Sequence, residues 1–159
     1  MTYLHGELEL MSPSIDHERI KTLFARLLEA YAEESGVELL GFGSWTIRSE
    51  SHERGLEPDE CYVIGVREVT APDIALEVVW TSGAIDKMDV YRGLGVREVW
   101  VWRDEHIEVN VLRDGNYERV DRSELLPSLD LARVASFLDR ADQTSAVREY
   151  RASLRASAL

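Results

Sequence analysis

The segment that most constrains the fold of this chain is residues 74–80, with the sequence IALEVVW. It is the most strongly apolar strand-like run in the chain, and its only charged residue is Glu77. Strands that are almost continuously apolar are typical of sheets that are buried on both faces. Residues 74–80 are therefore predicted to form a strand at the centre of a sheet.

A long amphipathic helix is predicted over residues 14–35. Residues 12–14 (SPS) offer a helix start, Asp16 and Glu18 lie in the first turn, where the helix dipole favours acids, and Gly36 offers a stop. The apolar residues recur at the i, i+3, i+4, i+7 spacing of one helix face; they are Ile20, Leu23, Phe24, Leu27, Leu28 and Tyr31. This face is expected to pack on the sheet.

The remaining elements are shorter. Period-two alternation or short apolar runs predict further strands at residues 6–11, 37–41, 44–48, 61–64, 96–102, 107–112 and 117–120. Helices are predicted at residues 84–94, 131–138 and 146–154, and a polar loop at residues 49–56. Asp114 and Gly115 form a typical hairpin turn. The order of strand, helix, strands and helical crossover indicates an α/β or α+β fold with a mixed central sheet.

The length of 159 residues fits one domain, residues 1–159, in which residues 140–159 form a C-terminal helical extension. No window approaches the roughly 18 uninterrupted apolar residues that a membrane helix needs, and the first residues carry acids where a signal peptide carries bases. Cys61 is the only cysteine, which excludes an internal disulfide, and we interpret it as a small buried residue. We therefore expect a cytoplasmic protein.

The charge of the chain bears on its partners. It contains 30 acidic residues against 18 Lys and Arg, which gives a net charge of −12. This balance argues against broad non-specific nucleic-acid binding, for which a basic surface supplies most of the affinity. It does not exclude an enzyme that acts on nucleic acid, because metal ions can neutralise charge locally at the site.

Glu77 is a candidate for chemistry, because an ionised carboxylate inside an apolar strand is costly unless it is paired or bound to a metal. Asp59 lies at the start of another predicted strand, and Lys87 lies in the predicted helix that follows the central strand. Carboxylates from neighbouring strands can share Mg²⁺, which takes one or two carboxylates together with waters and substrate phosphate oxygens. A nearby lysine can orient or deprotonate an attacking water, or stabilise charge on the phosphoryl oxygens. These three residues suffice for phosphodiester hydrolysis.

The same residues lie in stretches that resemble a known family. The stretches are residues 6–17, 57–59 (EPD), 72–79 (PDIALEVV), 86–100 and 126–129 (LPSL). Residues 86–100 include Asp86, Lys87, Tyr91 and the run GVREVW. In this order and spacing they resemble the Uma family of putative restriction endonucleases, which belongs to the PD-(D/E)XK nuclease superfamily. The similarity covers most of residues 6–138.

This resemblance implies a restriction-endonuclease-like core, in which a mixed central sheet is flanked by helices and the metal site lies at the strand ends. It also implies that Asp59 and Glu77 are the two acids of the superfamily motif and that they bind Mg²⁺ or Mn²⁺. The motif lysine is normally two residues after the second acid, but position 79 is valine, and Lys87 matches the lysine of this family. Residues 80–83 (WTSG) depart from the serine–proline pattern that is usual after the strand.

From these features we expect an endonuclease acting on DNA, with Asp59, Glu77 and Lys87 as its catalytic residues. A homodimer is expected, because restriction-type nucleases pair two sites to cut two strands. The net charge and the departure at residues 80–83 favour an alternative, a non-catalytic binding or assembly module that retains the nuclease fold. A metal-dependent phosphohydrolase that acts on small nucleotides is a third hypothesis.

Each of the three residues also has a structural interpretation. Glu77 could be a core acid paired with Lys87 or an arginine, with no metal, because buried ion pairs perturb acids in a similar way. Asp59 could shape the turn after Pro58, as aspartates often do. Lys87 could be solvated, as helix lysines usually are.

Several neighbouring residues are open to two interpretations. Glu18 could supply a further metal ligand, or it could favour the helix start through the dipole alone. His17 matches a histidine common in the family, and it could touch the site or satisfy the helix start. Asp73 lies on the same predicted strand as Glu77, about 13 Å away along the strand, too far to share one ion, and we interpret it as structural.

Two further groups are interpreted without a role in catalysis. Trp100 and Trp102 alternate on one strand and are expected to pack in the core or at an interface. Arg148, Arg151 and Arg155 recur at helical spacing on the last predicted helix, where they could contact phosphate or a partner, but a solvated face is the default expectation.

Overall fold

A computed structural model describes residues 1–66, 68–79 and 85–157 of the chain. Its helices are α1 (Ile15–Ser35), α2 (Lys87–Leu94), α3 (Leu131–Leu138) and α4 (Gln143–Ser157). Its strands are β1 (Thr2–Leu4), β2 (Glu7–Glu9), β3 (Leu39–Gly41), β4 (Ile47–Ser49), β5 (Arg54–Leu56), β6 (Glu60–Ile64), β7 (Ile74–Val78), β8 (Glu98–Arg103), β9 (His106–Arg113) and β10 (Asn116–Val120). None of the helices in these residues is long and apolar enough to cross a membrane.

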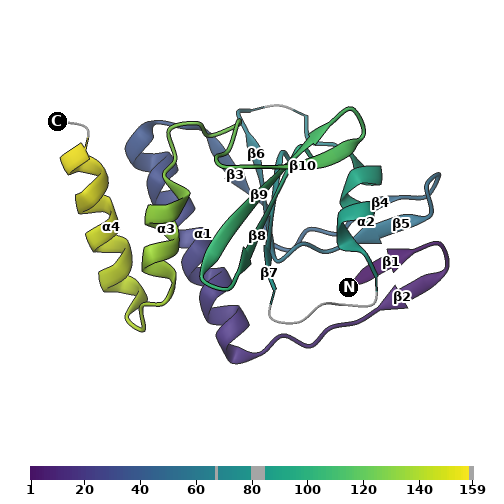
Figure 1. Cartoon of the computed structure of the whole chain (residues 1–159), viewed down its shortest axis with the longest axis horizontal. Coiled ribbons are helices and arrows are strands. Elements are labelled where there is room, and N and C mark those ends of the chain that lie inside the picture. Colours follow the sequence, from purple (N-terminus) through teal and green to yellow (C-terminus); the bar gives the residue numbers. More distant parts are fainter. Residues whose placement is uncertain (67, 80–84, 158–159) are drawn as a thin grey trace.

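The strands form two sheets, shown in Figure 1. The larger has the order β10-β9-β8-β7-β6-β3, and the smaller has the order β2-β1-β5-β4. In the larger sheet β7 and β8 are parallel and are joined through α2, whereas the other neighbours are antiparallel. The prediction of a mixed central sheet with residues 74–80 near its middle is confirmed for the described part of that range, because all five residues of β7 are buried.

The alternation of side chains along β7 divides the interior into two cores. Ile74, Leu76 and Val78 point to a large core that α1, α3 and α4 cover. Ala75 points to a smaller core that α2 and β5 cover on the opposite face. Figure 1 shows the same layers, with α1, α3 and α4 on one side of the larger sheet and α2 with the smaller sheet on the other. Glu77 has the parity of Ala75 and therefore faces the α2 side.

Helix α1 begins and ends as the sequence predicts. The Ser14 side chain accepts a hydrogen bond from the His17 backbone N–H at 3.2 Å, which satisfies a donor that has no partner within the helix. Gly36 adopts the left-handed conformation, with a φ of 67°, and closes the helix. The predicted hairpin turn is also confirmed, because Asp114 and Gly115 both have positive φ.

The predicted loop over residues 49–56 is wrong in part, because residues 54–56 form β5, the centre of the smaller sheet together with β1. Strand β1 was not predicted either. Three-residue strands are too short to show a period-two pattern. Strands β1 and β5 are stabilised by pairing with each other, and by the pairing of β1 with β2 and of β5 with β4. Gly55 fits β5 because a Cβ there would lie 3.1 Å from the Ile47 carbonyl oxygen.

The last helix is held to α1 by ion pairs. Arg151 and Arg155 both pair with Glu34, at 2.9 and 2.7 Å, and Arg151 also pairs with Glu33. These pairs hold the pKa of Glu34 well below its ordinary value of 4.5, at about 2. The expectation of a solvated face is therefore confirmed for Arg148 and Arg155, which are exposed, and is wrong for Arg151, whose side chain is only 30% exposed. Sequence spacing alone does not show that α4 lies against the acidic end of α1. Arg148 bonds to Ser145 on its own helix, at 2.9 Å.

Candidate functional site

The register of β6 and β7 brings the two predicted acids together. Glu60 pairs with Leu76 and Cys61 with Ala75 in this antiparallel ladder. One step further along the same register, Asp59 comes opposite Glu77. The Val78 backbone N–H donates to Asp59 Oδ2 at 2.7 Å, which ties the residue before β6 to the end of β7. The two carboxylates thus come from neighbouring strands, as the sequence predicts.

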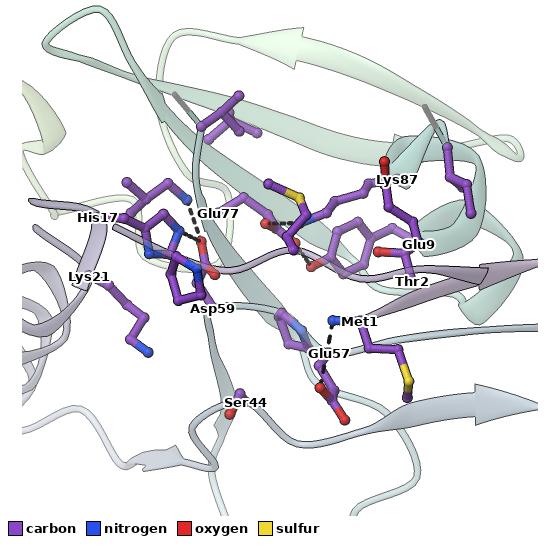
Figure 2. Close-up of a pocket in the computed structure, with 18 of the residues that line it drawn as sticks. Met1, Thr2, Glu9, His17, Lys21, Ser44, Glu57, Asp59, Glu77 and Lys87 are labelled. Atoms are coloured by element: carbon purple, nitrogen blue, oxygen red, sulfur yellow. Dashed lines mark hydrogen bonds and ion pairs between the residues drawn. The ribbon is translucent and has the colours of Figure 1, made fainter. Parts of the chain in front are cut away.

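Both acids line a cavity of about 440 Å³, and so do Lys87 and Glu18. The structure therefore brings together all four residues that the sequence singled out for the site. The cavity is bounded by α1, by the ends of β6 and β7, by the start of α2 and by the segment around β1 and β2. Figure 2 shows His17, Lys21 and Asp59 together in one part of this cavity, and Glu77, Lys87 and Glu9 in another.

Glu77 is a deeply buried acid with two donors among the described residues. It is 3% exposed, and Lys87 Nζ lies 2.6 Å from Oε2, while the Tyr91 hydroxyl donates to Oε1. Burial raises the pKa of the Glu77 carboxyl and the charge of Asp59 adds to this effect, while Lys87 and Tyr91 oppose it. The ion pair with Lys87 that the structural interpretation required is present.

Lys87 reaches the cavity because of the way α2 begins. Asp86 is the N-cap, and its side chain accepts from the Met88 backbone N–H at 2.9 Å, so Lys87 is the first residue of the helix. Burial by itself lowers the pKa of the Lys87 ammonium, yet Glu77, and further off Asp59, raise it above its ordinary value. Lys87 is therefore a charged group directed at the acids, and the interpretation of a solvated helix lysine is wrong.

Asp59 is held from the side of α1 by a chain of polar contacts. His17 Nε2 lies 3.0 Å from Asp59 Oδ2, the oxygen that also accepts from the Val78 backbone. The other ring nitrogen of His17 lies 3.2 Å from Glu18 Oε1, and Lys21 Nζ lies 2.7 Å from Glu18 Oε2. The hydrogen bond from Lys21 lowers the pKa of the Glu18 carboxyl. Glu18 thus lines the cavity as the partner of His17 and Lys21.

Sequence reasoning left the role of His17 open and gave Tyr91 no role, although the structure places both against the predicted acids. A signal for Tyr91 was present, because residues four apart on a helix share a face, and Tyr91 follows Lys87 by four. His17 is distant from Asp59 in sequence, and only the packing of α1 on the sheet brings the two together. Glu9, from β2, lines the cavity as well and had no sequence signal.

The other singled-out residues lie outside the cavity lining. Asp73 lies at the opposite end of β7 from the site, where it accepts from the Ile64 backbone N–H at 2.8 Å and pairs with Arg97. Trp100 and Trp102 pack in the large core, and Cys61 is buried as a free thiol. These interpretations are confirmed. Residues 80–83, whose sequence departs from the family pattern, lie outside the described residues, and so does Ala84, the first residue of the predicted helix 84–94.

The donor set of the cavity fits a hard divalent cation. The described residues contain no group of three or more His, Cys, Asp or Glu side chains suited to hold a metal. Asp59 and Glu77 nevertheless present two carboxylates from adjacent strand ends, and in the part of the chain that the structure describes no hydrogen bond reaches Asp59 Oδ1. Mg²⁺ commonly binds through one or two carboxylates and completes its shell with waters and substrate oxygens, so two suffice.

Comparison with known proteins agrees with this fold. A crystal structure of a putative nuclease belonging to DUF820 from Anabaena variabilis ATCC 29413 superposes with a TM-score of 0.59 at 15% sequence identity. The match covers 86% of this chain and 90% of that one, and it shows a shared restriction-endonuclease-like fold. No curated protein gives a significant match. A family model described as putative restriction endonuclease, Uma2, matches residues 1–140, and the chain therefore belongs to this family.

Proposed function

We propose that this chain is a divalent-metal-dependent endonuclease that hydrolyses phosphodiester bonds in DNA. The observation that carries the proposal is that Asp59, Glu77 and Lys87 line one cavity. They come from the residue before β6, from β7 and from the start of α2. A buried acid opposite a second acid, with a lysine held against it, provides both cation ligands and a positive charge for a phosphoryl group. Membership of a family described as restriction endonucleases supports the same chemistry.

Asp59 and Glu77 would hold the cation, which is Mg²⁺ or Mn²⁺. When bound, it would supply Lewis-acid stabilisation of charge on the phosphoryl oxygens and favour a water nucleophile at neutral pH. The polar contacts of the two acids support this role, because Val78 N–H and His17 fix one oxygen of Asp59. Partners of this kind orient a ligand before the metal arrives. We propose that Glu18 acts through His17 in this way.

The protein groups contribute orientation and charge. Tyr91 and Lys87 hold the two oxygens of Glu77, and Lys87 donates from a partly exposed position on the cavity wall. Its ammonium is therefore placed to stabilise the negative charge that develops on the non-bridging oxygens during displacement. Asp59 is the more accessible of the two acids, at 18% exposed against 3% for Glu77.

The experiment that tests this function is cleavage of plasmid and linear DNA by the purified chain in Mg²⁺, in Mn²⁺ and in excess chelator. Asp59→Asn, Glu77→Gln and Lys87→Gln are each expected to reduce cleavage at least 100-fold, the order of loss for one transition-state contact. Asp114→Asn is the matched control, because asparagine tolerates the left-handed turn conformation and Asp114 does not line the cavity. Equal cleavage by Asp59→Asn and Asp114→Asn would refute the proposal.

The proposal extends to assembly. We propose that residues 1–159 act as one domain in which α4 is an extension fixed to α1, and that two copies pair so that both strands of a duplex are cut. Sedimentation of the wild type at micromolar concentration tests the pairing. A monomer that still makes double-strand breaks would refute the homodimer.

One observation favours the alternative of a non-catalytic module. Both oxygens of Glu77 already have protein donors, Lys87 and Tyr91, and a satisfied buried ion pair needs no metal for stability. The two functions differ in their response to cation. A catalytic site gains thermal stability when Mn²⁺ binds, and this gain disappears in Asp59→Asn.

A further inference from the structure

An aromatic pair lies beside the cavity in the segment between β3 and β4. Phe42 is 41% exposed, and its ring centroid is 5.7 Å from that of Trp45, which is half-buried. Ser44 lies between them in sequence and lines the cavity, where Figure 2 labels it. The flat faces of partly exposed aromatic rings suit planar ligands.

This segment is fixed to the residues on both sides of Asp59. The Phe42 backbone N–H donates to the Cys61 carbonyl at 2.9 Å, and Cys61 Sγ donates to the Gly43 carbonyl at 3.3 Å. On the other side, the Thr46 hydroxyl donates to Glu57 Oε1 at 2.9 Å. Residues 57 and 61 bracket Asp59, so the aromatic pair keeps a set position relative to the candidate metal ligand.

Lysine usage points to the same region. The chain has 18 Lys and Arg residues, of which only Lys21 and Lys87 are lysine, and both line the cavity. Lys21 lies on the same cavity as the aromatic segment, because Ser44 of that segment lines the cavity too. The Lys21 ammonium pairs there with Glu18 Oε2 at 2.7 Å. A lysine is a compact, mobile charge suited to phosphate contact.

The rest of the surface offers little for a phosphate backbone. The net charge is −12, which disfavours attraction of a phosphate backbone to the surface as a whole. A protein that tracks a duplex by its charge neutralises about 6–10 phosphates. This chain must therefore obtain affinity from a few contacts near the cavity. Stacking a base on an aromatic ring is worth about 5- to 150-fold in affinity and does not depend on sequence.

We propose that Phe42, Trp45 and Lys21 form a nucleotide-binding subsite that selects single-stranded or locally unpaired DNA. One unpaired base stacks on the exposed ring of Phe42, which packs at a tilt of 47° against Trp45, and Lys21 contacts the adjoining phosphate. A base inside a duplex has neighbours on both faces, so it reaches such a ring only after it leaves the stack. The inference rests on the proposed function, since it places the subsite beside the phosphodiester site.

The test is fluorescence anisotropy of a labelled single-stranded oligonucleotide and of its duplex, with Ca²⁺ in place of the catalytic cation. Phe42→Ala is expected to weaken single-strand binding about 10-fold and Lys21→Gln several-fold. Val66→Ala is the matched control, because Val66 is 81% exposed and follows the far end of β6 from Asp59. Phe42→Ala keeps the backbone bond to Cys61, and circular dichroism confirms its fold.

Salt dependence provides a second readout. Two phosphate contacts on a single strand, by Lys21 in the subsite and by Lys87 at the phosphodiester site, give a slope of about −1.4, so raising salt from 50 to 200 mM weakens binding about 7-fold. A loss of a thousandfold or more would overturn the subsite, because it would require a basic surface. Equal affinities for Phe42→Ala and Val66→Ala, or tighter binding of duplex than of single strand, would overturn it too. So would self-association that Phe42→Ala abolishes while oligonucleotide affinity stays unchanged.

The outcome separates this inference from the proposed function. Single-strand binding that depends on Phe42, in a protein that cleaves nothing in Mg²⁺ or Mn²⁺, supports the subsite and refutes the endonuclease. Metal-dependent cleavage with unchanged Phe42→Ala affinity refutes the subsite and leaves the endonuclease intact.

Discussion

Tyr91→Phe is the substitution that most directly probes the buried acid. It deletes one hydroxyl from a fully buried residue and leaves the ring in place, so Glu77 Oε1 loses its donor while Lys87 stays on Oε2. A hydrogen bond to a charged group contributes about 1.5–3 kcal/mol. We expect a loss of about 2 kcal/mol in the free energy of unfolding, which lowers the Tm by about 4–8 °C in a domain of this size.

The same change should weaken cation binding. Burial already raises the pKa of the Glu77 carboxyl, and the Tyr91 hydroxyl counteracts this rise. Its removal raises the pKa further and takes away the hydrogen bond that orients Oε1 as a metal ligand. Thermal unfolding and Mn²⁺ titration at neutral pH, each on wild type and variant, measure the two effects.

Tyr117→Phe is the matched control. The Tyr117 hydroxyl donates to the Val96 carbonyl at 2.6 Å, a bond between neutral groups that contributes about 1 kcal/mol. We expect a smaller loss of stability and unchanged Mn²⁺ affinity. In a Glu77→Gln background, Tyr91→Phe should cost about half as much or less, because the acceptor is then neutral. Equal effects of the two tyrosine substitutions, or an undiminished cost in that background, would refute the reasoning.

Three further outcomes are expected. Glu98→Gln should lower the free energy of unfolding, measured in urea, by about 3 kcal/mol. The buried Glu98 carboxylate accepts four hydrogen bonds, one of them from the Trp100 indole N–H at 2.7 Å, and the amide nitrogen of glutamine would face some of these donors. Glu34→Gln should lower the thermal stability by its full amount above pH 4.5, and by progressively less as the pH falls to about 2, where the two proteins should unfold at the same temperature. The reason is that the pKa of Glu34 is 4.5 in the unfolded chain and about 2 in the folded one, so its stabilising charge is lost over this interval. His17→Ala should weaken Mn²⁺ binding about 10-fold through loss of the partner of Asp59, whereas exposed His106→Ala should leave it unchanged.

The elements that position the site could be predicted because each has a local cause. The apolar run around Glu77 indicated the central strand, and the periodicity of residues 14–35 indicated α1. The helix predicted at residues 84–94 contains Lys87, although in the structure this helix begins only at Lys87, after its cap Asp86. Such signals lie within one element, so the sequence contains them in full.

The contacts that complete the site depend on pairing between distant segments. The hydrogen bond from Val78 to Asp59 requires the register of β6 and β7, and the contact of His17 with Asp59 requires α1 to pack across a strand end. Strands β1 and β5 have the same origin, since neither is long enough to carry its own pattern. Periodicity reports which face of an element is buried, but it does not report the neighbour.

The most direct test of the two-carboxylate site is calorimetric titration of Mn²⁺ into the folded wild type, Asp59→Asn, Glu77→Gln and the control Asp114→Asn. We predict one binding site in the wild type and in Asp114→Asn, and its loss in the two cavity variants. Unchanged binding in Asp59→Asn, or no binding to a well-folded wild type, would contradict a metal held between Asp59 and Glu77.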